Sequence, residues 1–363
     1  MKQGRGAINR VSTIPQPVSR LYPAEWEKQS TVWLSCPHNE KEWGKKRLDG
    51  IKQFYVELIN KILDFQNVNL IFTSEELLHK AETYHGMSQQ AQQKKNKLKK
   101  VIIPNNDIWI RDYGPFFLEV KEGKRKKPLV LDFEFNAWGG KFPPWELDNN
   151  LPKGIALFSG LEIESYPIIL EGGALEFSGD GIILTTEECL LNKNRNKDLS
   201  KEQTESILKS AFNTEEVIWL ERGLANDHTD GHIDNVARFI GQRKVLICKS
   251  SNKKEKNFPH LLKSTTLLKE WKHPKKGYRL EVIEIPLPEP TDAKIKDLPC
   301  SYANFIFVNG GIIVPTYNST TDEAALKIFQ FLFPDRKVIG IDCSLLIQEG
   351  GSIHCMTKQE PLL

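Results

Sequence analysis

The end of the chain holds a cysteine in a setting that suits a nucleophile. Residues 348–357 read QEGGSIHCMT, so Cys355 follows a Gly-Gly pair and an Ile-His pair. Two glycines permit close backbone approach and positive φ, which suits a strand that delivers a side chain into a crowded pocket. We interpret Cys355 as a nucleophile around which other polar motifs assemble. The alternative is a buried cysteine on a late strand, because free cysteines are commonly buried.

A second motif, Asp107-x-Trp109-x-Arg111-Asp112, alternates polar or aromatic residues with apolar ones. On an extended segment the first three would share one side of the chain, and Asp112 would fall on the other. We interpret the motif as an acid that grips a planar cation beside a tryptophan wall. A surface ion pair next to a core tryptophan is the alternative.

Two further motifs supply carboxylates and histidines. Glu171 lies between an apolar run and a Gly-Gly pair, where it would either orient and charge a histidine or serve as a turn acid. In the run His228-x-Asp230-x-His232-x-Asp234, our interpretation is that His232 is a general acid and base and Asp234 a substrate anchor. A metal site is the alternative, but no second histidine or cysteine cluster completes a coordination sphere, so we predict no metal.

Together the motifs combine a thiol, a histidine and several separate carboxylates, which indicates a cationic substrate. Hydrolases of esters or peptides need an oxyanion hole and usually one carboxylate at most. Several acids around a thiol instead suit a cation whose charge is neutralised while its carbon is attacked. A guanidinium group fits, because it is planar and offers five donors that carboxylates can accept in pairs.

The composition predicts a cytoplasmic protein that binds neither nucleic acid nor membrane. In 363 residues, 50 Lys and Arg against 47 Asp and Glu give a net charge of +3, without the basic excess of a nucleic-acid binder. The six cysteines are far apart, with no CxxC pair. Neither an apolar signal segment nor a long uncharged apolar stretch is visible. A reducing compartment would keep the thiols free.

Hydrophobic periodicity predicts a mixed α/β chain in which strands and helices alternate. Helices are expected over 48–65, 75–100, 199–212, 258–271 and 322–332. Strands are expected at 30–35, 68–73, 116–120, 129–135, 165–170, 182–186, 217–220, 236–240, 244–248, 279–285, 303–308, 312–314 and 337–341. Residues 138–152 are expected to form an irregular loop.

Gly-Gly pairs recur along the chain and suggest a repeat. Residues 170–176 echo residues 348–354, and weaker echoes stand at 138–140 and 309–311. Such a recurrence indicates a radial or solenoid array, and a closed propeller would explain why no linker divides the chain. We therefore expect one catalytic domain over 1–363 with a loose arm over 1–20. An open α/β sheet with chance Gly-Gly pairs is the alternative.

Several motifs in the same order resemble one known family. They are Trp109-x-Arg111-Asp112-x-Gly114-Pro115, Glu171-Gly172-Gly173, residues 185–195 (TTEECLLNKNR), residues 231–235 (GHIDN), residues 301–311 (SYANFIFVNGG) and residues 350–355 (GGSIHC). From about residue 20 to the C-terminus the chain resembles the agmatine deiminases, also called bacterial-type peptidylarginine deiminases, of the guanidino-group-modifying superfamily. The resemblance implies a five-bladed α/β propeller with pseudo-fivefold ββαβ repeats.

The resemblance also implies roles for the motif residues. Cys355 would attack the guanidinium carbon, and His232, held by Glu171, would protonate the departing ammonia and then activate water. Asp112 and Asp234 would clamp the guanidinium nitrogens. Trp109 would lie against the alkyl stem, and no metal or organic cofactor would be needed. The bound cation would lower the pKa of the thiol and so help to form the thiolate.

One departure from the family pattern bears on the substrate. Where these deiminases commonly carry an acid four residues before the histidine, this chain has His228, flanked by Asp227 and Asp230. In the family that acid helps to bind the far amine of agmatine, so Asp227 and Asp230 are candidate substrate ligands here. Tyr113 also stands where threonine is more usual.

We predict a hydrolase that converts agmatine and water to N-carbamoylputrescine and ammonia on a polyamine route. Free arginine or a peptide C-terminal arginine is an alternative substrate, and an amidinotransferase with the same residues is an alternative reaction. A non-catalytic binder of arginine-like cations is the third hypothesis. The expected partner is a small guanidino compound, and the sequence leaves the oligomeric state open, a homo-oligomer included.

Overall fold

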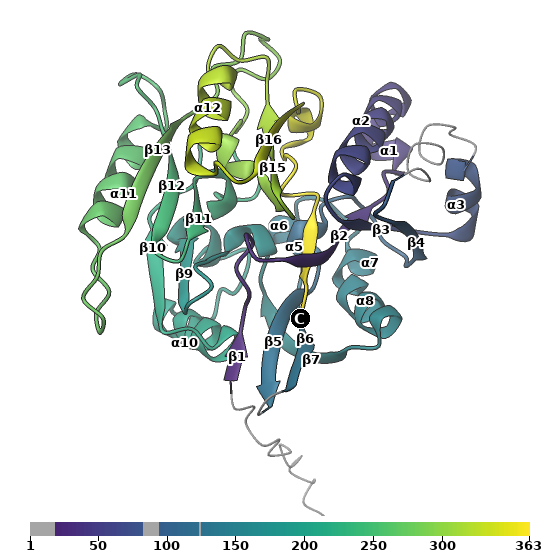
Figure 1. Cartoon of the computed structure of the whole chain (residues 1–363), viewed down its shortest axis with the longest axis horizontal. Coiled ribbons are helices and arrows are strands. Elements are labelled where there is room, and N and C mark those ends of the chain that lie inside the picture. Colours follow the sequence, from purple (N-terminus) through teal and green to yellow (C-terminus); the bar gives the residue numbers. More distant parts are fainter. Residues whose placement is uncertain (1–18, 83–93, 123–124) are drawn as a thin grey trace, which may run out of the picture.

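The computed structural model describes residues 19–82, 94–122 and 125–363, which form a mixed α/β fold (Figure 1). Within this part of the chain the strands form five sheets. Their members, in spatial order, are β1 (Ser19–Leu21), β5 (Phe116–Glu122), β6 (Arg125–Glu134) and β7 (Glu162–Ile169); β10 (Glu216–Leu220), β9 (Ile182–Thr186) and β8 (Glu176–Phe177); β11 (Ala237–Gly241), β12 (Lys244–Lys249) and β13 (Glu281–Pro286); β14 (Ile306–Val308), β15 (Gly311–Thr316) and β16 (Lys337–Asp342); and β17 (Lys358–Pro361), β2 (Gln29–Ser35), β3 (Asn67–Phe72) and β4 (Leu98–Ile102).

The five sheets share one pattern of pairing. In each, an antiparallel pair is followed by a helix and then by a parallel strand: β5, β6 and β7; β8, β9 and β10; β11, β12 and β13; β14, β15 and β16; and β17, β2 and β3. The connecting helices are α8 (Leu151–Ser159), α10 (Lys201–Phe212), α11 (Phe258–Glu270), α12 (Asp322–Leu332) and α2 (Lys45–Leu63). The last sheet joins the two ends of the described chain, because β17 pairs with β2.

The helices form where apolar periodicity and capping agree. Helix α2 buries one face, from Leu48 to Leu63, against the core. Helix α10 begins with a capping box, in which the Ser200 side chain accepts from the Gln203 amide and the Gln203 side chain accepts from the Ser200 amide. The predicted helices over 48–65, 199–212, 258–271 and 322–332 are confirmed, with boundaries shifted by three residues or fewer.

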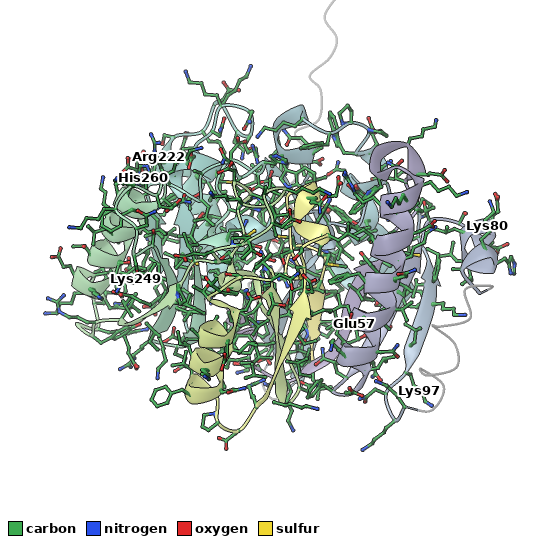
Figure 2. All side chains as sticks on the ribbon, turned by 90° about the horizontal axis from the view of Figure 1, so that it is seen from above. Glu57, Lys80, Lys97, Arg222, Lys249 and His260 are labelled. Carbon is green, nitrogen blue, oxygen red and sulfur yellow. The ribbon has the colours of Figure 1, made fainter. Side chains whose placement is uncertain are left out.

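The prediction of one or two helices over 75–100 is wrong at its end. Helix α3 covers Glu75–Glu82, residues 83–93 lie outside the described residues, and β4 begins at Leu98. β4 is an edge strand, and lysines are common on exposed edges because they discourage further pairing. Figure 2 shows charged side chains such as Lys80, Lys97, Arg222 and Lys249 at the outer margins of the molecule.

Two further expectations differ from the structure. The region 138–152 is not an irregular loop throughout, because α6 (Ala137–Gly140), α7 (Glu146–Asn149) and the start of α8 lie in it. The expected loose arm over 1–20 lies outside the described residues except for its last two, which belong to β1. No helix in the described ranges is both long and apolar enough to cross a membrane.

The repeat is real in element order but does not follow the Gly-Gly pairs. These pairs occupy different structures: Gly139 lies in α6, Gly172 in the short helix η1 (Gly172–Ala174), Gly310 in the β14–β15 hairpin and Gly350 after η4 (Leu346–Glu349). Instead, a short helical turn precedes the antiparallel pair of four of these sheets. These turns are α5 (Ile110–Tyr113), η1, η2 (Ile233–Asn235) and η3 (Tyr302–Asn304). Neighbouring members contact one another, α5 with η1, η1 with η2 and η2 with η3, and so bring distant sequence segments together.

Candidate active site

The Cys355 thiol lies in a turn that leads from η4 into β17, so the predicted strand around it is not formed. Its Sγ lies 3.1 Å from the Asn304 Nδ2 donor, and the thiol donates to Asp234 Oδ2 at 3.7 Å. The side chain is 6% exposed and lines a pocket. Burial, with the negative charges of Asp234 and Asp112, raises the pKa of Cys355 well above its usual value. The resting group is therefore a neutral thiol.

Asp112 reaches the pocket from a helical segment. The expectation of an extended segment around it is wrong. Trp109 directly precedes helix α5 and Asp112 lies within it, and both side chains line the pocket. Arg111 points elsewhere, and its Nη1 donates to Glu25 Oε1 at 2.8 Å. Two donors fix the Asp112 carboxylate: Trp138 Nε1 at 2.9 Å from Oδ2 and the Gly173 amide at 2.8 Å from Oδ1.

The charge state of Asp112 is set by its surroundings. Burial, together with the charges of Asp234 and Glu171, raises the pKa of Asp112 to about 6, against the opposing effect of His232 and the Trp138 hydrogen bond. The carboxylate is thus ionised near neutral pH but held at an energetic cost. A bound cation would relieve that cost.

His232 lies next to Asp112, with its Nδ1 3.6 Å from Asp112 Oδ1. A carboxylate oxygen of Glu171, the Cys189 sulfur and a ring nitrogen of His232 all lie within 4.8 Å of one another, and all three residues are buried. Burial opposes the charged imidazole, but Asp112, Cys189 and Glu171 outweigh it and raise the pKa of His232 well above its usual value. The imidazolium is therefore the resting form.

Glu171 is near His232 but is held by another residue. Its Oε1 accepts from Arg195 Nε at 2.7 Å, and its Oε2 lacks a hydrogen-bond partner among the described residues. Neither ring nitrogen of His232 has such a partner there either. Glu171 therefore acts on His232 in this structure through charge at short range, with Arg195 behind it.

Asp234 is fixed by His354 through the same carboxylate oxygen that the thiol contacts. Its Oδ2 lies 2.8 Å from His354 Nδ1, and His354 Nε2 lies 3.1 Å from Glu25 Oε1. Glu25 also pairs with Arg111 and Arg238, so a buried charge network supports this carboxylate. Burial alone would raise the pKa of Asp234, but the His354 hydrogen bond and charge lower it. Asp234 is therefore ionised beside Cys355.

Asp227 and Asp230 do not line the pocket, in contrast to the expectation that they bind substrate. Asp227 accepts from the Thr229 amide at 2.9 Å and from Asn235 Nδ2 at 3.1 Å. Asp230 accepts from Asn194, Arg195 and Lys141. These carboxylates hold the loop in place, and Asp230, whose φ of 65° lies in the left-handed region, pairs with Arg195.

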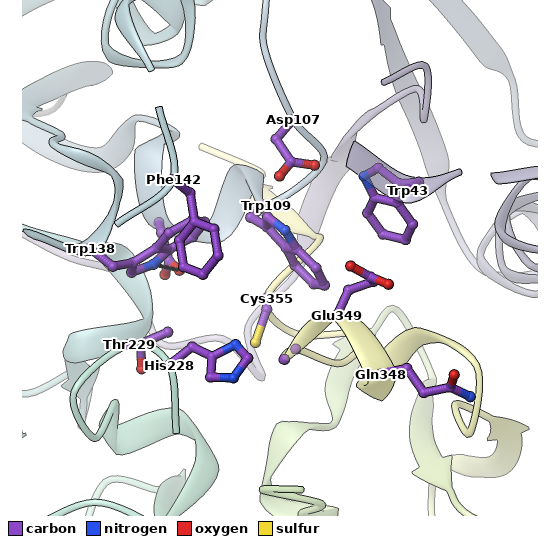
Figure 3. Close-up of a pocket in the computed structure, with 13 residues that line it drawn as sticks. Trp43, Asp107, Trp109, Trp138, Phe142, His228, Thr229, Gln348, Glu349 and Cys355 are labelled. Carbon is purple, nitrogen blue, oxygen red and sulfur yellow. Dashed lines mark hydrogen bonds between the residues drawn. The ribbon is translucent and has the colours of Figure 1, made fainter. Parts of the chain in front are cut away.

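The pocket has aromatic walls and an acidic lining (Figure 3). It is lined by Trp43, Asp107, Trp109, Asp112, Trp138, Phe142, His228, Thr229, Gln348, Glu349, Gly350, Gly351 and Cys355. The rings of Trp43 and Trp109 are stacked, with centroids 6.2 Å apart. The lining includes three carboxylates but no lysine or arginine, so it suits a cation with an apolar stem.

Two groups of side chains have the ligand types of a metal site: Glu171, Cys189 and His232, which are all buried, and the half-buried Glu25 with buried Glu176 and His354. Each group already contains an arginine partner. Arg195 pairs with Glu171, and Arg238 pairs with both Glu25 and Glu176. These guanidinium groups balance the carboxylate charge that a metal ion would otherwise balance.

Comparison with known proteins agrees with this geometry. The model of the Porphyromonas-type peptidyl-arginine deiminase family matches residues 21–361. The chain belongs to this family. Among its curated relatives is the agmatine deiminase of Pseudomonas putida, which is 33% identical over 364 residues, covering 93% of this chain and 95% of that protein.

Solved structures of the family have the same fold. A variant of the C. jejuni agmatine deiminase with substrate bound is 33% identical and has a TM-score of 0.82, over 94% of this chain and 96% of that one. The agmatine deiminase of Enterococcus faecalis is 28% identical and has a TM-score of 0.85, with the same coverage. The fold is thus the mixed α/β fold of the Porphyromonas-type peptidyl-arginine deiminase family.

Sequence reasoning missed several residues of this family member's site. Asn304 was visible only as part of a motif, although its amide lies beside the Cys355 sulfur. Trp138 precedes a Gly-Gly pair, and His354 is adjacent to Cys355. Both residues therefore stand in recognisable motifs, but the motifs did not indicate what these two side chains do. Glu25 had none, because a single glutamate near the start of the described chain gives no hint of a buried ion pair with Arg238.

Gly173 tests how tightly this family site is packed. A Cβ added there would lie 2.6 Å from His232 Nδ1, 2.7 Å from Asp112 Oδ1 and 3.1 Å from Asp234 Oδ2. We expect Gly173→Ala to lower kcat/KM for a guanidino substrate by roughly a hundredfold, because small displacements of catalytic groups are costly. Steady-state kinetics would measure kcat/KM, and thermal unfolding would show whether the variant is folded.

The matched control is Gly241→Ala, whose added Cβ would lie 3.3 Å from Lys244 Cβ in a hairpin outside the pocket. It should leave kcat/KM within about threefold, as expected for a change that touches no catalytic group. Equal activity of Gly173→Ala and Gly241→Ala would contradict the packing described here.

Proposed function

We propose that this protein hydrolyses agmatine to N-carbamoylputrescine and ammonia through a covalent intermediate on Cys355. The observation that carries the proposal is the grouping of the Cys355 thiol with two carboxylates, Asp234 at 3.7 Å and Asp112 in the same pocket, and of His232 with Asp112 at 3.6 Å. This arrangement suits attack on a cationic planar carbon. The agmatine deiminase relatives, at 33% identity, support the same reaction.

The pocket lining favours agmatine over arginine. Agmatine carries a guanidinium at one end and an ammonium at the other, whereas free arginine and a C-terminal arginine residue carry a carboxylate. Three lining residues are acidic and none is lysine or arginine. A substrate carboxylate would meet like charges there, which raises the free energy of binding.

The first half-reaction forms the C–S bond and breaks a C–N bond. Substrate binding brings positive charge to Asp112 and Asp234, and the same charge lowers the pKa of Cys355, so that the thiol releases its proton to solvent and the thiolate forms. The thiolate attacks the guanidinium carbon to give a neutral tetrahedral species. The His232 imidazolium then protonates one amino group, ammonia leaves, and a cationic thiouronium remains on sulfur.

The second half-reaction reverses the role of His232. Now neutral, His232 accepts a proton as water attacks the thiouronium carbon. Collapse of the resulting tetrahedral species breaks the C–S bond and releases the ureido product, and the proton of its hydroxyl group returns the leaving sulfur to the thiol form. Glu171 favours the charged imidazole in both steps, and Trp109 packs against the alkyl chain.

We also propose that the described sheets are the blades of a five-bladed α/β propeller within one catalytic domain. The support is the recurring order of antiparallel pair, helix and parallel strand, together with the pairing of β17 with β2 that would close a ring. The five sheets lie around the short helices α5 and α6 (Figure 1). The site then lies where the short turns of the blades meet.

Ammonia release from agmatine, arginine and an arginine-tailed peptide, measured side by side, tests the function. We expect kcat/KM for agmatine to exceed that for the other two by at least about a hundredfold, since unpaired buried charges are strongly disfavoured. The ureido product should form without any added amine. If agmatine is the slowest substrate the substrate assignment is wrong, and if release requires an amine acceptor the reaction is amidino transfer.

A further inference from the structure

The far end of the pocket contains a carboxylate that the hydrolysis mechanism does not use. We propose, building on the proposed agmatine hydrolysis, that Glu349 binds the distal ammonium group of the substrate and so determines specificity for a diamine-derived guanidine. The inference rests on where this side chain lies, what surrounds it and which of its neighbours are already engaged.

Glu349 is carried to the pocket by the backbone around it. It ends η4, and Gly350 then turns the chain in the left-handed region, with φ of 89°. The next residue, Gly351, lies so close to Trp109 that an added Cβ would be 2.4 Å from the indole ring. This close packing holds Glu349 near Trp43 and Trp109, where Figure 3 shows its carboxylate.

The other pocket carboxylates have engaged oxygens. Asp112 accepts from Trp138 and Gly173 beside the thiol, at the guanidinium end. Asp107 Oδ1 accepts from the Ile108 amide at 2.7 Å and so fixes the entry to α5. Glu349 differs, because its bonding partner is the guanidinium of Arg47 from α2.

The pair of Glu349 with Arg47 leaves the carboxylate available to a second cation. The Glu349 side chain is 17% exposed and that of Arg47 is 42% exposed. Ion pairs with a solvated partner contribute little, so a substrate ammonium can join or replace Arg47 at small cost. An ammonium beside the Trp43 and Trp109 rings also gains cation–π stabilisation.

This placement explains how one pocket could read both ends of its substrate. Asp112 and Asp234 neutralise the guanidinium beside the sulfur, Trp109 contacts the alkyl chain, and Glu349 neutralises the ammonium. A substrate with a carboxylate at the far end would instead face a negative charge there. Glu349 is therefore a specificity residue, and its effect should depend on the substrate's far charge.

The experiment compares agmatine with butylguanidine, which has the same guanidinium and alkyl chain but lacks the ammonium. In Glu349→Gln we expect KM for agmatine to rise on the order of ten- to a hundredfold, as a lost charge-assisted hydrogen bond predicts. kcat should stay within about threefold, and both constants for butylguanidine should be unchanged, because the reacting end is untouched.

Two further variants make the result specific. Glu323→Gln removes an exposed acid that pairs with Lys327 on α12, and it should leave both substrates unaffected. The double variant Arg47→Gln with Glu349→Gln should keep the raised KM for agmatine, because the loss comes from the missing carboxylate. If the double variant restores the wild-type KM, the unpaired Arg47 caused the loss and the inference is overturned.

The outcomes also separate this inference from the function on which it rests. Turnover of both guanidines by the wild type, with a selective loss for agmatine in Glu349→Gln, supports both proposals. Turnover of both with an equal effect of Glu349→Gln on each overturns the role of Glu349 alone. Absence of turnover of either guanidine by the wild type overturns both proposals.

Discussion

Replacing Cys355 by serine should abolish turnover of agmatine while leaving its binding nearly intact. We expect kcat to fall by at least about ten-thousandfold, as when the nucleophile of other covalent enzymes is removed. A serine hydroxyl is a far weaker nucleophile than a thiolate, and a bound cation that helps to ionise a thiol does not bring a hydroxyl into its ionised form. Calorimetry should give a Kd for agmatine within about fivefold of the wild-type KM, because the carboxylates that hold the guanidinium remain.

The covalent intermediate gives this prediction a second readout. Wild-type protein quenched with acid during turnover should carry the mass of a thiouronium adduct on the peptide that contains Cys355, and Cys355→Ser should carry none. Cys36→Ala is a suitable control, since Cys36 is also a buried thiol but does not line the pocket. Wild-type rates in Cys355→Ser, or an adduct on another cysteine, would remove Cys355 from the chemistry.

Periodic patterns in the sequence were enough to predict most of the regular elements. Helix α12 was predicted with its observed bounds, and α2 and α10 nearly so, because each carries an apolar stripe and α10 a capping box. Short segments were less predictable. The turn α5 has too few residues for a period, and the alternation around Trp109 was mistaken for an extended strand.

The site was predictable in its chemistry but not in its connections. Thiol, histidine and carboxylates stood out as types, and the structure brings Cys355, Asp234 and Asp112 close together. What orients them depends on contacts across the chain: Glu25 and His354 are 329 positions apart. No local pattern encodes such a pair. The same reason explains why Asp230, two residues before His232 in sequence, pairs with Arg195 instead of lining the pocket.

The acidic residues around Cys355 affect the stability of the fold and the binding of a cation differently. In the buried site, Asp112 and Asp234 are ionised and Cys355 is a neutral thiol. The charge on Asp112 and the formation of the Cys355 thiolate are both unfavourable in this buried space, and a bound cation would relieve both. In the proposed mechanism, binding free energy is thus used to form the nucleophile, so that the reactive thiolate would exist only when there is a guanidinium for it to attack.

Replacing Asp112 by asparagine should remove activity but not the fold. We expect kcat/KM for agmatine to fall by roughly a thousandfold, since loss of one member of a buried charge pair costs several kcal/mol. An amide carries no charge and cannot neutralise the guanidinium. The two carboxylate oxygens of Asp112 accept from Trp138 and Gly173, whereas an asparagine side chain has only one oxygen that can accept. His232 would also lose the charge that raises its pKa most, so ammonia would lose part of its acid catalyst.

Stability should change far less than activity. The pKa of Asp112 is raised in the folded chain, to about 6, above its usual value, so ionisation at pH 7 destabilises the empty fold. Removing that charge offsets the loss of hydrogen bonds, and Tm should fall by no more than a few degrees. Asp132→Asn is the matched control, because Asp132 is similarly buried and accepts from Ser165 but does not line the pocket. Asp132→Asn should retain wild-type kcat/KM. Near-normal activity in a well-folded Asp112→Asn variant would show that other groups hold the guanidinium.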